Sequence, residues 1–135
     1  MTVAIPTVGR SDVLAVTLRD LAQQQGVRFE TVIVNQNDDP LDAVAEVANT
    51  HGLAVRCYRQ VEANASLARN VALREAAAPI VLFIDDDMKI EDQQFLASHL
   101  SCYDDGQLTG VCGQVLAPGC QPRTRPLHRF ANHPR

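Results

Sequence analysis

The stretch IVLFIDDDMKI, residues 80–90, sets five apolar residues directly before three aspartates. An unbroken apolar run of this length is typical of a strand covered on both faces in a parallel sheet. The adjacent carboxylates of Asp85, Asp86 and Asp87 repel one another unless a cation or water compensates their charge. Hard oxygen ligands suit Mg²⁺ or Mn²⁺, so the stretch predicts a metal site at a strand end. The alternative is a solvated acidic turn ahead of a helix, where acidic residues are favourable.

Strands and helices alternate on both sides of this stretch. Short β-rich or apolar runs are separated by segments whose apolar residues recur at helical spacing. The pattern predicts strands over residues 2–5, 30–34, 53–58, 80–84 and 109–116, and helices over 11–25, 41–52, 64–78 and 91–103. Such alternation indicates an α/β fold with a mostly parallel, doubly wound sheet. Ligands bind such sheets outside the carboxyl ends of the strands.

Three further polar side chains are expected near those strand ends. Thr7 follows the first strand, Asn35 follows the second, and Arg69 lies early in the helix that Asn64 can cap. An arginine there can bind a phosphate or pair with an aspartate. A plain turn, an Asx turn and a structural ion pair are the alternatives for the three positions. Neither a G-x-G-x-x-G nor a P-loop pattern is present, which weighs against a dinucleotide oxidoreductase and a P-loop NTPase.

Charge and proline content divide the chain near Ala117. The 135 residues are 46% hydrophobic and 21% charged, with a net charge of −4, which suits one domain with a hydrophobic core. Residues 1–116 hold all 16 acidic residues and eight of the 12 basic ones, whereas residues 117–135 hold four arginines, four prolines and no acid. We therefore predict a domain over residues 1–116 and an extended or disordered tail over 117–135.

Cysteine and aromatic content narrow the function classes. Four cysteines without a secretory signal predict reduced thiols in the cytoplasm, either in solution or peripherally at a membrane. No apolar run approaches the ~20 residues needed to span a bilayer. The absence of Trp, with only two Tyr and four Phe, argues against a stacking surface for nucleic acid. An exposed sheet edge would allow pairing with a second copy of the chain.

Taken in order along residues 2–116, these segments resemble the family 2 glycosyltransferases of the GT-A fold. The resemblance rests on VAIPTVGR (3–10), ETVIVNQND (30–38), NASLARNVALREA (64–76), IVLFIDDDMKIEDQQFL (80–96) and GVCGQVL (110–116). It implies a Rossmann-like nucleotide-binding half. It also implies transfer of a sugar from a nucleotide-diphosphate sugar donor to an acceptor, which could be a saccharide, a lipid-linked group or a protein.

The resemblance also implies roles for the residues that match its motifs. Thr7 would line the nucleoside site, and Asn35 would take the place of a base-reading aspartate. Arg69 would contact the nucleotide or steady the acidic cluster, and Asp86 would approach the ribose.

Asp85 and Asp87 would form the D-x-D motif of the family. They would bind Mg²⁺ or Mn²⁺ beside the donor, with Asp87 best placed for direct metal contact. The physical chemistry agrees, because a diphosphate leaving group gains negative charge that a bound divalent cation stabilises.

Three features depart from the family pattern. Asn35 both donates and accepts hydrogen bonds, whereas the usual aspartate only accepts. Ser66 stands where the family often has glycine. No Asp or Glu follows Asp105, although inverting members carry their catalytic base downstream, within hydrogen-bond reach of the acceptor. We therefore expect the donor-binding portion of such an enzyme without its catalytic base. The alternatives are a non-catalytic nucleotide-sugar or metal-binding module acting with a partner and, with less support, a nucleotidyltransferase.

Overall fold

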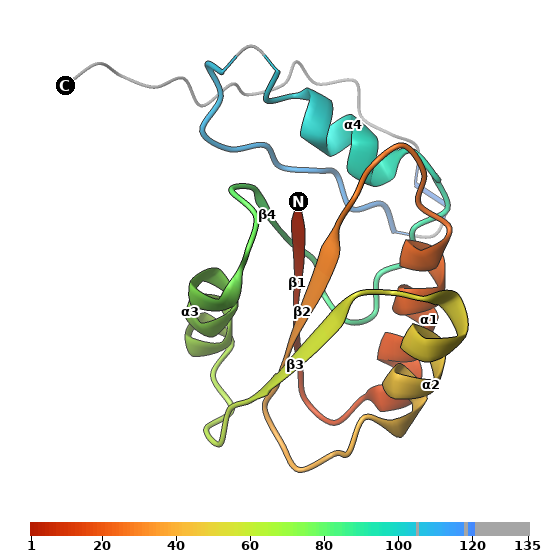
Figure 1. Ribbon diagram of the computed structural model, residues 1–135, viewed down its shortest axis with the longest axis vertical. Coiled ribbons are helices and arrows are strands. Elements are labelled where there is room, and N and C mark those ends of the chain that lie inside the picture. Colours follow the sequence, from red (N-terminus) through yellow and green to blue (C-terminus); the bar gives the residue numbers. More distant parts are fainter. Residues whose placement is uncertain (105, 118, 121–135) are drawn as a thin grey trace, which may run out of the picture.

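The chain forms a four-stranded sheet flanked by helices (Figure 1). A computed structural model describes residues 1–104, 106–117 and 119–120. The elements in chain order are β1 (Thr2–Thr7), α1 (Ser11–Ala22), β2 (Glu30–Asn35), α2 (Asp42–His51), β3 (Val55–Arg59), α3 (Ala65–Glu75), β4 (Val81–Phe83) and α4 (Phe95–Ser101). The predicted α/β class is therefore confirmed.

All strand pairs in the sheet are parallel, in the order β3-β2-β1-β4. The chain adds β2 and β3 on one side of β1 and then returns to place β4 on the other side. The order therefore reverses between β1 and β4, and a ligand crevice is expected outside the carboxyl ends of these two strands. The register sets Thr7 at the end of β1 opposite Asn35 at the end of β2.

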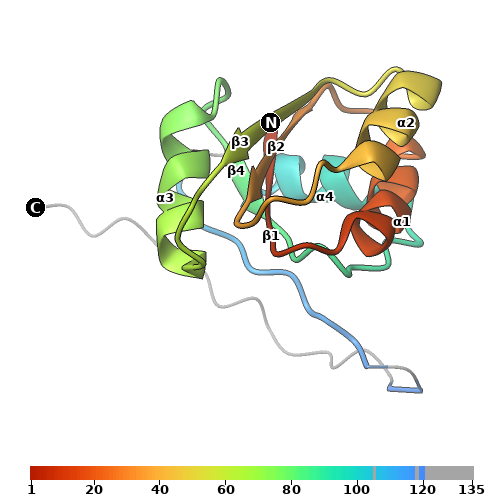
Figure 2. The same ribbon diagram turned by 90° about the horizontal axis from the view of Figure 1, so that it is seen from below.

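Helices cover both faces of the sheet, as the doubly wound prediction requires. Helices α1 and α2 lie on one face and α3 lies on the other (Figure 2). Alternate residues of one strand serve the two cores, because side chains of a strand point in opposite directions. Ile5 packs into the core under α1 and α2, whereas Ala4 packs against Ala68 and Ala72 of α3.

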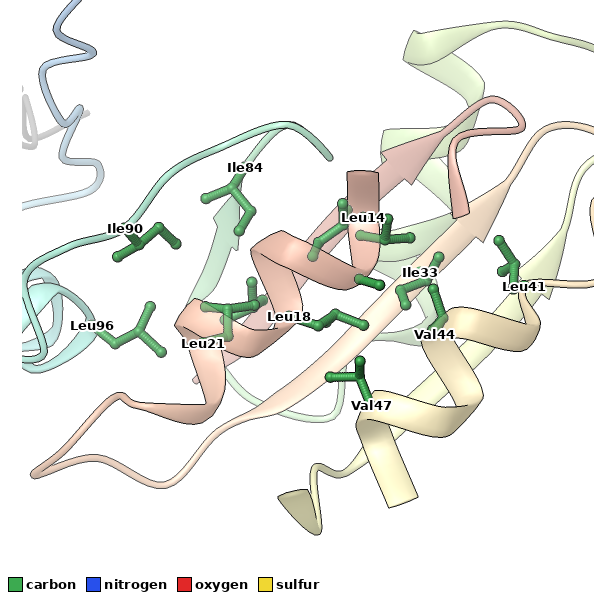
Figure 3. Close-up of a cluster of buried hydrophobic side chains, with 13 residues drawn as sticks. Leu14, Leu18, Leu21, Ile33, Leu41, Val44, Val47, Ile84, Ile90 and Leu96 are labelled. Atoms are coloured by element: carbon green, nitrogen blue, oxygen red, sulfur yellow. The ribbon is translucent and has the colours of Figure 1, made fainter. Parts of the chain in front are cut away.

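The larger core joins α1 and α2 to the sheet and to the segment after β4 (Figure 3). Leu14, Leu18 and Leu21 form a fully buried stripe along α1, at the spacing expected for one helix face. Each such side chain contributes about 1.5–3 kcal/mol through burial. Leu96 of α4 packs into the same core, so the segment after the aspartates is held against α1.

Local signals placed two helix ends as predicted. The Asn64 side chain caps α3 by accepting from the backbone N–H groups of Ser66 at 3.0 Å and Leu67 at 3.1 Å. Gly52 ends α2 in the left-handed conformation at φ 64°, where glycine meets no steric penalty.

Other helix ends differ from the prediction because backbone groups near them take part in other contacts, some with distant segments and some local. Helix α1 ends at Ala22 instead of residue 25, and the Gln25 N–H donates to the Gln93 carbonyl at 2.9 Å. Helix α4 begins at Phe95 instead of residue 91, after a turn in which the Asp92 carboxylate accepts from the Gln94 N–H at 2.8 Å. Helix α3 ends at Glu75, three residues earlier than predicted.

The strand predicted over residues 80–84 is present but shorter and not covered on both faces, and the strand predicted over 109–116 is wrong. Strand β4 spans Val81–Phe83 only and lies at the sheet edge, so Phe83 is 36% exposed and not covered on both faces. No strand forms over residues 109–116. Residues 111–113 instead line a hollow of about 190 Å³ together with β4. A segment becomes a strand only when a neighbouring strand lies close enough for backbone hydrogen bonds, and an apolar sequence does not provide that neighbour.

The predicted tail over residues 117–135 lies outside the described residues except for 117, 119 and 120. Its domain boundary therefore stays a prediction. Within the described ranges, none of the helices has the length and apolar character required to cross a membrane.

Candidate functional site

A buried carboxylate lies where the strand order reverses. Asp86 follows β4 and is only 2% exposed. The Thr7 hydroxyl at the end of β1 donates to Asp86 Oδ2 at 2.6 Å, and Thr7 is itself 2% exposed. The structure therefore brings together two residues predicted from separate motifs, 79 positions apart in the sequence.

Arg10 supplies the positive charge that this buried carboxylate needs. Its Nε donates to Asp86 Oδ2 at 3.2 Å and its Nη2 donates to Asp86 Oδ1, so that the guanidinium grips both carboxylate oxygens. The remaining nitrogen, Nη1, donates to Asp87 Oδ2 at 3.3 Å. The hydrogen bond and charge of Asp86 raise the pKa of Arg10 against the opposing effect of burial, with a smaller contribution from Asp87.

Sequence reasoning missed Arg10. It lies in the turn after β1, just before α1 begins at Ser11, and was not assigned a role. The sequence did contain a clue. If β1 and β4 are neighbours, an arginine in the turn after β1 lies opposite the three aspartates that follow β4. That adjacency follows from strand order, which the sequence pattern left open.

Helix α1 also holds the backbone of the aspartate turn. The Thr17 hydroxyl, 1% exposed, lies 2.8 Å from the Asp86 carbonyl oxygen and 2.9 Å from that of Met88. The Asp20 carboxylate accepts from the Ile90 N–H at 2.9 Å. These contacts hold the turn in a defined position relative to β1 and α1.

The other two aspartates are open to solvent. The side chains of Asp85 and Asp87 are 70% and 53% exposed. Arg69 Nη2 lies 3.9 Å from Asp85 Oδ1, at the limit of an ion pair, and both groups are exposed. The cluster thus offers two accessible carboxylates beside a buried, neutralised one.

These carboxylates suit a hard divalent cation that completes its coordination elsewhere. Among the described residues, no three His, Cys, Asp or Glu side chains converge into a ready-made metal site. Mg²⁺ commonly takes one or two carboxylates and fills its remaining positions with phosphate oxygens and water. The exposed carboxylates of Asp85 and Asp87 fit that requirement.

Asn35 has its amide engaged within its own loop. It is 6% exposed; its Nδ2 donates to the Asp39 carbonyl at 2.7 Å, and its Oδ1 accepts from the Asn37 N–H at 3.4 Å. One amide proton and one acceptor position remain unused by these two contacts. The loop also touches the turn after β1, where a Cβ at Gly9 would lie 2.1 Å from Asn37 Nδ2.

A separate hollow of about 440 Å³ opens between this loop, α2 and β3. Its lining includes Asn35, Tyr58 and Arg59 but none of Thr7, Arg69 or the three aspartates. The hollow therefore does not coincide with the charged cluster between β1 and β4.

The fold is a doubly wound parallel α/β sheet with an Asp cluster at the point where the strand order reverses, the place where such sheets bind ligands. Residues 2–135 match the family described as Glycosyl transferase family 2. The chain belongs to this family. No curated protein matches the sequence.

Solved structures of glycosyltransferases share the fold. S. aureus TarS (residues 1–349) is 26% identical with a TM-score of 0.68 over 86% of this chain and 37% of its own. A mannosyltransferase from Pyrobaculum calidifontis, in complex with GDP-Man and Mn²⁺, is 28% identical with a TM-score of 0.72 over 79% of this chain and 33% of its own. TarS has also been solved in complex with UDP-GlcNAc. This chain thus spans about a third of the length of these relatives.

Proposed function

We propose that this chain binds a nucleotide-diphosphate sugar at the carboxyl ends of β1 and β4, as the donor site of a glycosyltransferase. The observation that carries the proposal is the Thr7–Asp86–Arg10 cluster, which buries one carboxylate at the switch point and leaves Asp85 and Asp87 open beside it. A structural relative is in complex with a sugar nucleotide and Mn²⁺, which supports the same ligand class here.

Asp87 and Asp85 are our candidates for holding a divalent cation, Mn²⁺ or Mg²⁺. When bound, such a cation supplies positive charge that stabilises the diphosphate as the glycosidic bond breaks. Asp87 is the first candidate because its carboxylate is half-exposed and lies next to the anchored Asp86.

Thr7, Asn35, Arg69 and Asp86 are our candidates for the nucleoside side of the site. Asp86 already accepts three hydrogen bonds, from Thr7 Oγ1, Arg10 Nε and Arg10 Nη2. A carboxylate has about four acceptor positions, so one is left for a ribose hydroxyl. Arg69 lies on α3 near Asp85, within reach of a phosphate placed between them.

Calorimetric titration with UDP, GDP, UDP-GlcNAc and GDP-mannose, each with and without Mn²⁺, tests the proposal. We expect binding that Mn²⁺ strengthens, and loss of the Mn²⁺ effect in Asp87→Asn. Glu46→Gln is the matched control, because it removes one carboxylate charge from the exposed side of α2. Absence of nucleotide binding under both conditions would refute the donor site. An unchanged Mn²⁺ effect in Asp87→Asn would refute the metal assignment.

A non-catalytic binding module is the second candidate. It rests on the same cluster, whose contacts supply groups for a nucleotide and a metal and assign no base to an acceptor hydroxyl. Turnover of the bound sugar nucleotide with saccharide, lipid-linked and protein acceptors separates the two. Product formation by this chain alone would exclude the module.

We also propose a cytoplasmic location. All four cysteines are free thiols, as expected for a protein in a reducing compartment. Fractionation of cells tests this, and recovery mainly from an oxidising compartment would contradict it.

A further inference from the structure

We propose that Arg10 is a permanent counter-cation of Asp86 and a temporary partner of Asp87. In this view Arg10 keeps its grip on Asp86 throughout and releases Asp87 when a divalent cation binds there. The inference rests on the proposed metal site and concerns a residue to which neither the sequence motifs nor the comparisons assign a role.

The two contacts of Arg10 differ in kind. Two guanidinium nitrogens meet both oxygens of Asp86, a carboxylate that is 2% exposed and also accepts from Thr7. A single nitrogen, Nη1, meets Asp87 at 3.3 Å, where both side chains are about half-exposed. Paired hydrogen bonds to a buried carboxylate are strong and directional, whereas a single exposed ion pair contributes little.

Burial explains why the Asp86 contact persists. The Arg10 side chain is about half-exposed, but Asp86 is buried, and a buried carboxylate that loses its counter-cation is destabilising. Asp87 has no such constraint, because water can replace Arg10 at its exposed oxygens. A competing cation therefore takes Asp87 and leaves the Arg10–Asp86 pair intact.

The arrangement has a consequence for charge. Arg10 neutralises the buried Asp86, so the two exposed carboxylates, Asp85 and Asp87, are left to match the charge of one divalent cation. Arg10 also holds positive charge beside the expected diphosphate position, which is favourable for an anionic donor. Arg10 is thus a positioning residue for Asp87, the candidate metal ligand, and it also competes with the metal for the Asp87 carboxylate.

The double variant Arg10→Met, Asp86→Asn tests the competition. It replaces both members of the Arg10–Asp86 pair with neutral side chains of similar volume, so the net charge is unchanged and Arg10 no longer competes with the metal for Asp87. Mn²⁺ affinity is measured without nucleotide, because Asp86 is also a candidate for the nucleoside side of the site, by calorimetry and by the electron paramagnetic resonance signal of free Mn²⁺. We expect affinity about two- to fivefold tighter than wild type, the range that a half-exposed ion pair supports.

The matched control is Arg56→Met, Glu30→Gln, which removes an ion pair of the same kind at the amino ends of the strands. We expect wild-type Mn²⁺ affinity from it. Equal or weaker Mn²⁺ binding by the Arg10 double variant than by wild type, with the control unchanged, would overturn the inference.

A second measurement uses the wild-type chain and does not depend on a variant that folds. Arginine side-chain NMR follows the Arg10 Nε–H group, assigned through its own backbone. We expect its protected signal in the metal-free chain and its retention at saturating Mg²⁺, because Nε stays on Asp86. Loss of the signal on Mg²⁺ addition would show that Arg10 leaves Asp86 and would overturn the inference.

The outcomes also separate this inference from the proposed function. A wild-type chain that binds neither nucleotide nor Mn²⁺ refutes the donor site itself. A wild-type chain that binds both, together with a double variant of unaltered Mn²⁺ affinity, refutes the role of Arg10 alone.

Discussion

The three adjacent aspartates occupy three different environments. Their exposed fractions are 70% for Asp85, 2% for Asp86 and 53% for Asp87. Hydrogen bonds from Thr7 and Arg10 hold the middle carboxylate inside the fold, while its two neighbours face water. The central residue can therefore serve as an anchor and the outer two as ligands.

Gly9 allows two loops of the site to approach each other. Its φ of 60° disfavours other residues, and a Cβ would meet Asn37 Nδ2 at 2.1 Å. We expect Gly9→Ala to lower the free energy of unfolding by about 1–2 kcal/mol through the left-handed backbone alone. Displacement of Asn37 should also weaken nucleotide binding. Urea denaturation and calorimetry measure the two effects.

Gly110→Ala is the control for this substitution. Gly110 has ordinary backbone and no atom within 4 Å of an added Cβ, so the same change should be neutral or slightly stabilising. Equal stability of the two variants would contradict the steric argument for Gly9.

At the scale of elements, an ion pair ties four of them together at the end of the sheet opposite the site. Glu30 of β2 accepts from Thr2 of β1 at 2.7 Å, from Arg56 of β3 at 2.7 Å, and from the Ala77 N–H after α3 at 2.8 Å. Arg56 also donates to the Glu75 carbonyl at the end of α3 at 2.6 Å. This cluster joins α3 to the three strands β1, β2 and β3.

The same cluster predicts a pH dependence of stability. Burial alone would raise the pKa of Glu30, but the hydrogen bonds from Thr2, Ala77 and Arg56 and the Arg56 charge lower it below 4.5. A carboxylate with a lowered pKa in the folded state stabilises the protein above its unfolded pKa, and this contribution is lost as pH falls. The difference in free energy of unfolding between wild type and Glu30→Gln should therefore have its full size near pH 7 and shrink from about pH 5 downward.

Chemical denaturation at several pH values measures this difference. Glu46→Gln, an exposed change on α2, corrects for the loss of one carboxylate. A difference between wild type and Glu30→Gln that stays constant from pH 7 to pH 3 would refute the assigned role of Glu30.

At the scale of the whole molecule, the site is built from parts that meet only in the folded chain. The Thr7 and Arg10 turn, the aspartate turn and α1 are joined through the sheet and the core around Leu14 and Leu18. A ligand that binds here contacts the folded state alone. Within the described sheet, β3 and β4 are the outer strands. Pairing of two copies of the chain along such an edge stays a prediction.

Ligand binding should therefore stabilise the entire domain. At a concentration of 100 times its Kd, UDP or GDP with Mn²⁺ should add about 2.7 kcal/mol to the free energy of unfolding. Thermal melts should show a raised Tm that EDTA partly reverses. In Asp87→Asn, the part of the increase that depends on Mn²⁺ should disappear. A Tm that does not change with ligand concentration would contradict specific binding to the folded chain.

The sequence by itself determined the α/β class, the parallel sheet and two helix ends. Apolar periodicity, the Asn64 cap and the Gly52 stop depend on neighbouring residues, so they can be read locally. The three aspartates and Thr7 were also visible, because parallel strands bring their carboxyl ends to one edge.

Only the tertiary structure decided which of these residues meet and in which state. Arg10 and Asp86 are 76 positions apart, and their pairing depends on β1 lying next to β4. The predicted strand over residues 109–116 does not form, and α4 is shorter than predicted. Both differences depend on distant segments, because a strand needs a pairing partner and the Gln93 carbonyl accepts from the Gln25 N–H. Burial then distinguishes chemically identical aspartates, since solvent access and partners, not residue type, decide which carboxylate is anchored and which is free to bind.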